Sequence, residues 1–135
     1  MPARAGNYLL AMEPARILIV DDEPSILTLA SLILRNSGYP VLTSTNGQEG
    51  LEVFTVYRDT ISIVVTDVKM PVMGGIDMAK AIKSLKRDVH VIFVSGYAPN
   101  EEITELILAW DAQFISKPFD LQQLRGAVQR AAPMY

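Results

Sequence analysis

Acidic side chains follow two apolar segments of the sequence that are typical of buried strands. Asp21 and Asp22 come directly after residues 17–20, and Asp67 comes directly after residues 61–66. Buried strands of a parallel sheet direct their carboxyl ends to a shared crevice, so we expect the three carboxylates to converge there. Carboxylates at close range raise one another's pKa, and a hard divalent cation such as Mg2+ usually holds them together. The sequence therefore predicts a metal-dependent acidic pocket.

Two further side chains that could take part in this chemistry end later apolar segments. Ser95 follows residues 89–94, and Lys117 follows residues 114–116. Asp67 can act as a carboxylate nucleophile toward a phosphoryl group, and the bound metal can bridge to the phosphoryl oxygens. Lys117 can neutralise another oxygen as charge builds, while Ser95 adds a hydroxyl donor. This set of residues predicts phosphoryl-transfer chemistry.

Alternating strands and helices must position these residues. Apolar runs predict five strands, at residues 17–20, 39–45, 61–66, 89–94 and 114–116. Helices are predicted from apolar residues at helical spacing: Ile26, Leu29, Ala30 and Ile33; Leu51, Val53 and Phe54; Ile76, Ala79 and Ile82; Ile103, Leu106, Ile107 and Trp110; and Leu121, Leu124, Ala127 and Val128. With right-handed crossovers, these units predict an α/β fold, a flavodoxin-like doubly wound five-stranded parallel sheet with helices on both faces.

Single residues refine this assignment of elements. Asn46 and Asp120 can cap the second and fifth predicted helices. Gly50 and Gly126 fall inside predicted helices, where each costs about 0.5–1 kcal/mol relative to Ala unless close packing offsets it. The only histidine, His90, falls inside a predicted strand, where we expect a partly buried structural residue and not a ligand.

The composition limits the classes of function open to the chain. A chain of 135 residues with 50% hydrophobic and 20% charged residues is long enough for one well-cored domain and too short for two ordinary ones. The formal net charge of -3 gives no general attraction to nucleic acid or to an anionic membrane, so we expect neither as a direct partner. The absence of cysteine fits a reducing compartment, and we expect the cytoplasm.

Four motifs, taken together, resemble those of a known family. They are Val20-Asp21-Asp22-Glu23, Asp67-Val68-Lys69-Met70-Pro71-Val72-Met73-Gly74-Gly75, Ser95-Gly96, and Phe114-Ile115-Ser116-Lys117-Pro118-Phe119. Each motif is weak alone, but their order and their placement at strand ends are specific. The chain resembles the CheY-like receiver domains of two-component response regulators over nearly its whole length.

The resemblance implies a role for each residue of the pocket. Asp67 is implied to be the phosphoacceptor, and Lys117 the cation that contacts the phosphoryl group. The implied ligands of Mg2+ (or Mn2+) are Asp21, Asp22 and Asp67, together with the backbone carbonyl of Lys69.

The resemblance also implies a conformational switch. Ser95 would move toward the phosphoryl group, and Phe114 would turn inward behind it. In the family the peptide bond before the proline that matches Pro118 is usually cis, which would place the Lys117 side chain in the pocket. The turn Trp110-Asp111-Ala112 departs from the family, which commonly has glycine there, because none of these residues enters a left-handed cap freely.

The function that the resemblance implies is signalling, not enzymatic turnover, with at most self-phosphorylation from small phosphodonors and self-dephosphorylation. The implied donor is a sensor histidine kinase or a histidine phosphotransfer domain. The implied output is a downstream protein or a homodimer, bound through the face of the fourth helix, fifth strand and fifth helix. On the fourth helix, Leu108 lies about 140° from Ile103 at roughly 100° per residue, which makes it a candidate exposed contact.

The resemblance further bears on the lifetime of the phosphoryl group. It places Lys69, two residues after the acceptor, and Tyr97, two residues after Ser95, beside the path of the attacking water. A long cation and an aromatic ring can cover the phosphoryl group and exclude that water. We therefore expect a long-lived phosphorylated form.

We expect the receiver domain to span residues 15–131, between a flexible leader at residues 1–14 and a tail at residues 132–135. The apolar run at residues 8–12 is too short for a signal peptide or a membrane segment. We expect no output domain after this unit, so the sequence describes either a single-domain regulator or a fragment of a longer protein.

Alternative functions differ in what they require of the same residues. An aspartyl-phosphate hydrolase also uses an Asp nucleophile and Mg2+, but such enzymes usually place nucleophile and acid two residues apart after the first strand. Here Glu23 stands at that spacing from Asp21, and the better nucleophile, Asp67, follows the third strand. A docking module that has lost phosphorylation would not need the complete set of pocket residues. In a purely structural interpretation, the acidic residues are solvated strand ends.

Overall fold

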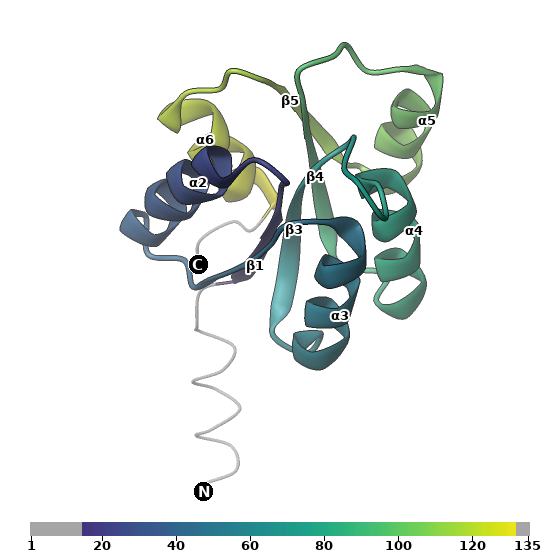
Figure 1. Cartoon of the computed structure of the whole chain (residues 1–135), viewed down its shortest axis with the longest axis horizontal. Helices are drawn as coiled ribbons and strands as arrows, with labels where there is room; N and C mark the ends of the chain where they lie inside the picture. The colour runs from purple at the N-terminus through teal and green to yellow at the C-terminus, as the bar shows by residue number, and fades with distance from the viewer. Residues whose placement is uncertain (1–14, 132–135) are drawn as a thin grey trace, which may run out of the picture.

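The computed structural model describes residues 15–131 and has one five-stranded parallel sheet at its centre (Figure 1). The strands lie in the order β2-β1-β3-β4-β5. After β2 the chain therefore crosses back past β1 and adds β3, β4 and β5 on the other side of β1. Their bounds are β1 Arg16–Val20, β2 Val41–Ser44, β3 Ile61–Asp67, β4 His90–Ser95 and β5 Gln113–Ser116. This confirms the predicted doubly wound, flavodoxin-like fold. The predicted leader and tail, at residues 1–14 and 132–135, lie outside the described residues.

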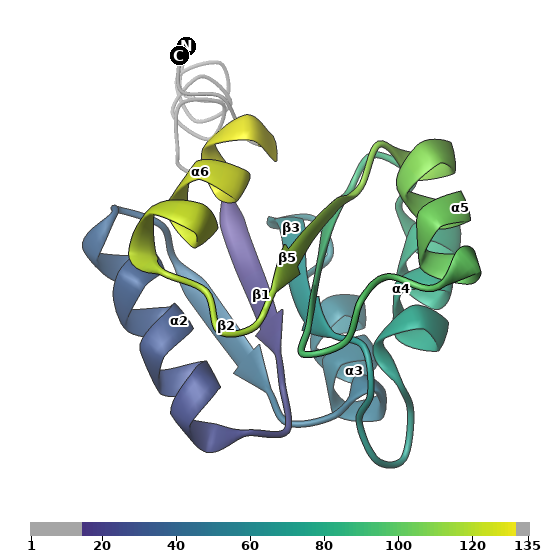
Figure 2. The same cartoon turned by 90° about the horizontal axis from the view of Figure 1, so that it is seen from above.

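Five helices cover the two faces of the sheet (Figure 2). They are α2 Pro24–Asn36, α3 Gly47–Tyr57, α4 Gly75–Leu85, α5 Glu101–Trp110 and α6 Leu121–Ala131. Helices α2 and α6 pack on one face, and α3, α4 and α5 pack on the other. Alternate residues of β1 show why the two faces of the sheet have separate cores: Ile17 and Ile19 belong to the core under α2 and α6, while Leu18 and Val20 belong to the core under α3 and α4.

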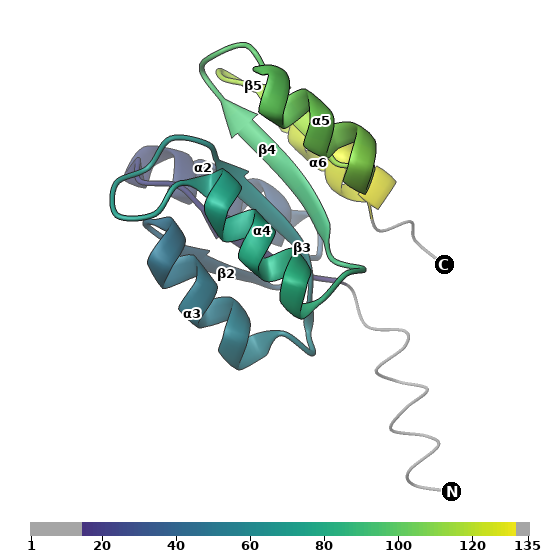
Figure 3. The ribbon, with the colours of Figure 1, turned by 90° about the vertical axis from the view of Figure 1, so that its right-hand side faces the viewer.

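The register of the strands aligns the residues that follow them. Val20 pairs with Thr66, Asp67 pairs with Val94, and Ser95 pairs with Ser116. The residues after β1, β3, β4 and β5 therefore meet at one edge of the sheet. Figure 3 shows the β3–α4 and β4–α5 loops at that edge.

The buried side of α2 differs in part from the predicted stripe. Ala30 and Ile33 are buried as expected, but Leu29 is 44% exposed and Leu34 is fully buried in its place. Seven of the nine residues from Ile26 to Leu34 are apolar, so helical spacing alone allows more than one buried face. In α6, Leu121 is likewise exposed, whereas Leu124, Ala127 and Val128 are buried.

The ends of three helices are fixed by polar or left-handed residues. Asn46 Oδ1 accepts a hydrogen bond from the Glu49 N–H at 2.9 Å, and Asp120 Oδ1 accepts one from the Gln123 N–H at 2.8 Å, as both predicted caps require. The turn after α5 does contain a left-handed cap, with Asp111 at φ 56° and ψ 37°. Aspartate tolerates this conformation better than most residues because its short side chain bonds locally.

Two single-residue predictions have different outcomes. A Cβ at Gly50 would lie 2.6 Å from Met78 Sδ and 3.0 Å from Val20 Cγ2, so close packing of α3 on α4 and β1 offsets the cost of that glycine. His90 is the first residue of β4 and is exposed, because the buried part of this strand begins one residue later; the prediction of a partly buried histidine is wrong. Across residues 15–131, every helix is too short or too polar to span a bilayer.

Candidate functional site

Three carboxylates meet at the carboxyl edge of the sheet. Asp21 and Asp22 follow β1 and Asp67 ends β3, and one oxygen from each lies within 4.8 Å of the others. Asp21 is 2% and Asp67 8% exposed, while Asp22 faces solvent. A set of oxygen ligands with one solvent-facing member suits a hard cation such as Mg2+, which keeps several waters. The acidic pocket expected from the sequence is present in the structure.

The Lys117 ammonium lies inside this cluster. Its Nζ is 2.9 Å from Asp21 Oδ2, 3.0 Å from Glu23 Oε1 and 3.3 Å from Asp67 Oδ2. The peptide bond between Lys117 and Pro118 is cis, as the resemblance implied. Sequence reasoning missed Glu23 as a partner of Lys117, since the two residues are 94 positions apart and nothing in their local sequence connects them.

The surroundings of the two central groups shift their pKa values. Burial, and then the negative charge of Asp21, raise the pKa of the Asp67 carboxyl above its ordinary value. Lys117 and the Val68 N–H, which donates to Asp67 Oδ1 at 2.8 Å, oppose this shift only in part. Burial alone would lower the pKa of Lys117, but hydrogen bonds to Asp21 and Glu23 raise it. Lys117 therefore stays an ammonium ion beside Asp67.

The backbone around Asp67 depends on glycine. Gly75 begins α4, and a Cβ there would overlap the carbonyl oxygen of Asp67, so α4 can start this close to the pocket only from glycine. The Gly75 N–H donates to the Val68 carbonyl at 2.9 Å and closes the β3–α4 loop. In the same loop Val72 has a φ of 71°, which is rare for a β-branched residue. The loop that follows Asp67 is thus held closely against the end of β3.

The predicted switch residues lie on adjacent strands. Ser95 is buried at the end of β4, and its Oγ accepts a hydrogen bond from the Tyr97 N–H at 3.1 Å. Its carbonyl accepts one from the Lys117 N–H at 2.8 Å, which links β4 to the end of β5. Phe114 pairs with Phe93 across the strands and is partly buried against the core under α4 and α5. In this structure the Ser95 hydroxyl is therefore hydrogen-bonded within the loop that follows β4.

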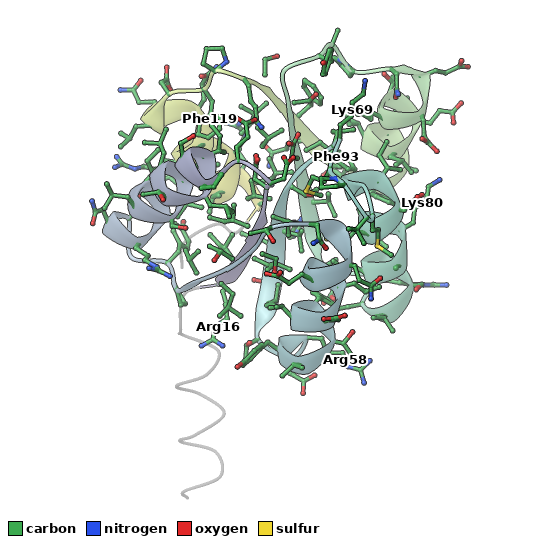
Figure 4. All side chains as sticks on the ribbon, in the orientation of Figure 1. Arg16, Arg58, Lys69, Lys80, Phe93 and Phe119 are labelled. Atoms are coloured by element: carbon green, nitrogen blue, oxygen red, sulfur yellow. The ribbon has the colours of Figure 1, made fainter. Side chains whose placement is uncertain are left out.

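Lys69 and Tyr97 contact each other beside the pocket. The Lys69 Nζ lies 4.3 Å from the centre of the Tyr97 ring, within the range of a cation–π interaction. Figure 4 shows Lys69 at the end of the sheet opposite Arg16 and Arg58. The contact joins the β3–α4 loop to the β4–α5 loop. That the Lys69 backbone carbonyl is a metal ligand stays a prediction.

This arrangement can support transfer of a phosphoryl group to a carboxylate. Asp67 offers an oxygen that faces a permanent cation, and Asp21 and Asp22 offer further oxygens for a divalent cation. Ser95 places a hydroxyl at the end of the neighbouring strand. These are the parts that an acyl phosphate needs: a nucleophile, charge compensation and a hydrogen-bond donor.

Comparison with known proteins points to one family. The sequence profile described as the response regulator receiver domain matches residues 17–129. The chain is 31% identical over 119 residues to sporulation initiation phosphotransferase F of Bacillus subtilis, with 88% of this chain and 94% of that protein covered. It is 34% identical over 115 residues to the sensor kinase CckA of Brucella abortus, with 85% of this chain but 12% of that kinase covered. The chain likewise spans 28% of the transcriptional regulatory protein GlrR of Escherichia coli.

Solved structures agree with this family. A response regulator receiver domain protein from Clostridium thermocellum is 34% identical with a TM-score of 0.75, covering 87% of this chain and 93% of that one. The CheX–CheY complex with BeF3 and Mg2+ from Borrelia burgdorferi matches with a TM-score of 0.80 and 28% identity, covering 87% and 89%. The receiver domain of the hybrid histidine kinase CckA matches with a TM-score of 0.73 and 31% identity, covering 87% and 98%.

Proposed function

The chain belongs to the response regulator receiver domain family, and on that premise we propose that Asp67 is the residue that accepts its phosphoryl group. Receiver domains are phosphoacceptor signalling domains, and this chain is one of them. The single observation that carries the assignment to Asp67 is its place in the pocket. Asp67 ends β3, the middle strand of the sheet, and Lys117 contacts one of its oxygens while the Val68 N–H fixes the other. Asp21 is also buried and contacts Lys117, but it lies beyond the end of β1.

The proposed reaction moves a phosphoryl group from a donor histidine to Asp67. The Asp67 Oδ2 attacks phosphorus, an O–P bond forms, the P–N bond to the donor histidine breaks, and the histidine leaves with the electron pair of that bond. Lys117, 3.3 Å from this oxygen, follows the negative charge onto the phosphoryl oxygens. Asp21, Asp22 and Asp67, with the Lys69 carbonyl, would hold Mg2+ or Mn2+, which supplies further charge neutralisation when bound.

We propose that the signal passes through Ser95 and Phe114. A phosphoryl group on Asp67 offers acceptor oxygens to the Ser95 hydroxyl, which would then leave the Tyr97 N–H. Since the Ser95 carbonyl is bonded to the Lys117 N–H, such a shift would reach β5 and Phe114. The face formed by α5, β5 and α6 is therefore the proposed contact for a downstream protein or a second copy.

The proposed donor is a sensor histidine kinase or a histidine phosphotransfer protein. Relatives named as a phosphotransferase and as a sensor kinase support this choice. We propose that the chain itself performs no turnover beyond self-phosphorylation from small donors and self-dephosphorylation. We also propose that the domain spans residues 15–131, while the cytoplasmic location stays a prediction from the cysteine-free sequence.

Incubation with acetyl phosphate and MgCl2, followed by mass spectrometry of the intact chain, tests this function. Wild type should gain about 80 Da, the mass of one phosphoryl group. Asp67→Asn should gain none, because an amide keeps the shape but cannot form an acyl phosphate. A matched exposed aspartate, Asp59→Asn, should behave as wild type. Turnover of the donor without an adduct would favour a hydrolase, and no reaction at all would favour a docking module.

A further inference from the structure

Glu23 makes an ion pair that the proposed phosphorylation site does not use. The Lys117 Nζ lies 3.0 Å from Glu23 Oε1 and 3.3 Å from Asp67 Oδ2. The Glu23 side chain is 57% exposed and that of Asp67 is 10% exposed, so Glu23 reaches Lys117 from the solvent side of the pocket. Its backbone is fixed, because its N–H donates to Asp21 Oδ1 at 2.9 Å and Pro24 begins α2 directly after it.

The bonds of Lys117 must be redistributed when Asp67 is phosphorylated. An ammonium group has three N–H donors, and Lys117 lies within ion-pair distance of three carboxylates, those of Asp21, Glu23 and Asp67. After transfer, the negative charge of Asp67 lies on the phosphoryl oxygens, and Lys117 must turn toward them. Of its three partners, Glu23 is the most exposed and the most screened by water, so that bond is the one that yields.

The charge of Glu23 also acts on the two ions that enter the pocket. With Asp21, Asp22, Glu23 and Asp67 ionised, four negative charges and the one positive charge of Lys117 leave three negative charges uncompensated. Glu23 therefore adds attraction for a divalent cation. It also repels the anionic phosphodonor and the phosphoryl group that results from transfer. The attraction for the cation favours the overall reaction, whereas the repulsion of the phosphodonor slows it. The two effects can be measured separately.

We propose that Glu23 is a positioning residue of the phosphorylation site. It contacts Lys117 from the solvent side of the pocket before transfer, strengthens the binding of Mg2+, and slows phosphorylation once Mg2+ is saturating. The effect on rate rests on the proposed function of Asp67, whereas the effect on metal affinity does not. Two readouts therefore separate a failure of this inference from a failure of the proposed function.

Two substitutions separate the effect of the charge of Glu23 from the effect of its side-chain length. Glu23→Gln keeps the length of the side chain and removes its charge. Glu23→Asp keeps the charge but shortens the side chain by one methylene, which moves the carboxylate away from Lys117. Glu102→Gln is the matched control, because it removes another exposed carboxylate that is paired with a lysine, Lys80, at 2.9 Å. Each protein is titrated with MgCl2 by calorimetry, and its phosphorylation by acetyl phosphate is timed at saturating Mg2+.

Glu23→Gln should weaken Mg2+ binding about two- to fivefold and raise the rate at saturating Mg2+ by a similar factor, the range for one exposed charge pair. Glu23→Asp should keep the wild-type Mg2+ affinity and react at a rate between those of wild type and Glu23→Gln, while Glu102→Gln should change neither quantity. Unchanged affinity and rate in Glu23→Gln, or a lowered rate at saturating Mg2+, would overturn the proposal. If even wild type takes up no phosphoryl group, the proposed function fails, and the Mg2+ titration alone decides the part of Glu23.

Discussion

The Lys69 ammonium lies 4.3 Å from the centre of the Tyr97 ring and so links the two loops that leave β3 and β4 at the pocket. Both residues stand two positions after a residue of the proposed site, Asp67 and Ser95. Tyr97 is largely exposed, so the contact contributes about 0.5–1 kcal/mol, enough to bias the loops but not to lock them. We expect this pair to cover the phosphoryl group on Asp67.

The first prediction is that this pair protects the phosphorylated form from water. Lys69→Asn and Tyr97→Ala should each speed the loss of the phosphoryl group by several-fold, because each breaks the contact that keeps the two side chains over the site. The double variant should be little faster than the single variants, since either change already breaks the contact. The measurement is the decay of the phosphorylated mass after the donor is removed. Decay at the wild-type rate in both single variants would show that the pair does not shield the site.

The second prediction concerns Mg2+ and folding. With the proposed ligands, Mg2+ would bind only the folded pocket and relieve repulsion among its carboxylates, so it should raise the Tm of wild type. At a hundredfold excess over Kd the gain is about 2.7 kcal/mol, which is several degrees in a domain of this size. Asp22→Ala should lose most of this gain, whereas Asp59→Ala, a change at an exposed aspartate outside the pocket, should keep it. Thermal melting with EDTA or MgCl2 gives the comparison; an unchanged Tm in every protein would mean that the ligands are assigned wrongly.

The third prediction is a pH dependence that arises from Asp67. Its pKa is raised in the folded chain, so its contribution to stability is fully present below the ordinary value of 3.8 and is lost as the pH rises through the raised value. Asp67→Asn removes this loss. In buffer with EDTA, the variant should gain free energy of unfolding relative to wild type between pH 4 and pH 7, as urea titrations at each pH can measure. A difference that is constant or reversed over this range would contradict the raised pKa.

Much of this pocket could be predicted because its residues end apolar runs. The run that ends at Asp67 and the run that ends at Ser95 are long and bounded by polar residues, and they become β3 and β4 with shifts of at most one residue. Parallel strands then bring their ends together by geometry alone. The positions of Asp21, Asp67, Ser95 and Lys117 at one edge therefore follow from the parallel direction of the strands.

The features that sequence reasoning missed depend on packing between distant segments. Glu23 meets Lys117 across 94 positions, and only the complete fold brings them together. Leu29 has the same helical spacing as its buried neighbours, and the docking of α2 on the sheet decides that Leu34 is buried in its place. The left-handed backbone of Val72 could not be predicted, because a β-branched residue rarely adopts a positive φ.

The fourth prediction concerns the output face. Leu108 on α5 is 81% exposed, as its helical position indicated, and it is the candidate apolar contact on the proposed face of α5, β5 and α6. Leu108→Glu should weaken self-association or partner binding of the form activated by beryllium fluoride by tenfold or more, because burying a charge is costly. Val56→Glu, at an exposed valine on α3, is the control and should have no effect. Sedimentation of activated and unactivated protein gives the self-association constants; equal constants for Leu108→Glu and wild type would remove this face as the dimer contact.

The central claim is that Asp67, and not a neighbouring carboxylate, carries the phosphoryl group. Loss of phosphorylation in a variant cannot by itself separate the acceptor from a metal ligand, because Asp21, Asp22 and Glu23 lie in the same pocket. The direct measurement is to phosphorylate wild type with acetyl phosphate, reduce the acyl phosphate with borohydride, and locate the reduced residue by tandem mass spectrometry. The reduced residue should be at position 67 alone. Reduction at position 21, 22 or 23 with position 67 unmodified would contradict the proposed function.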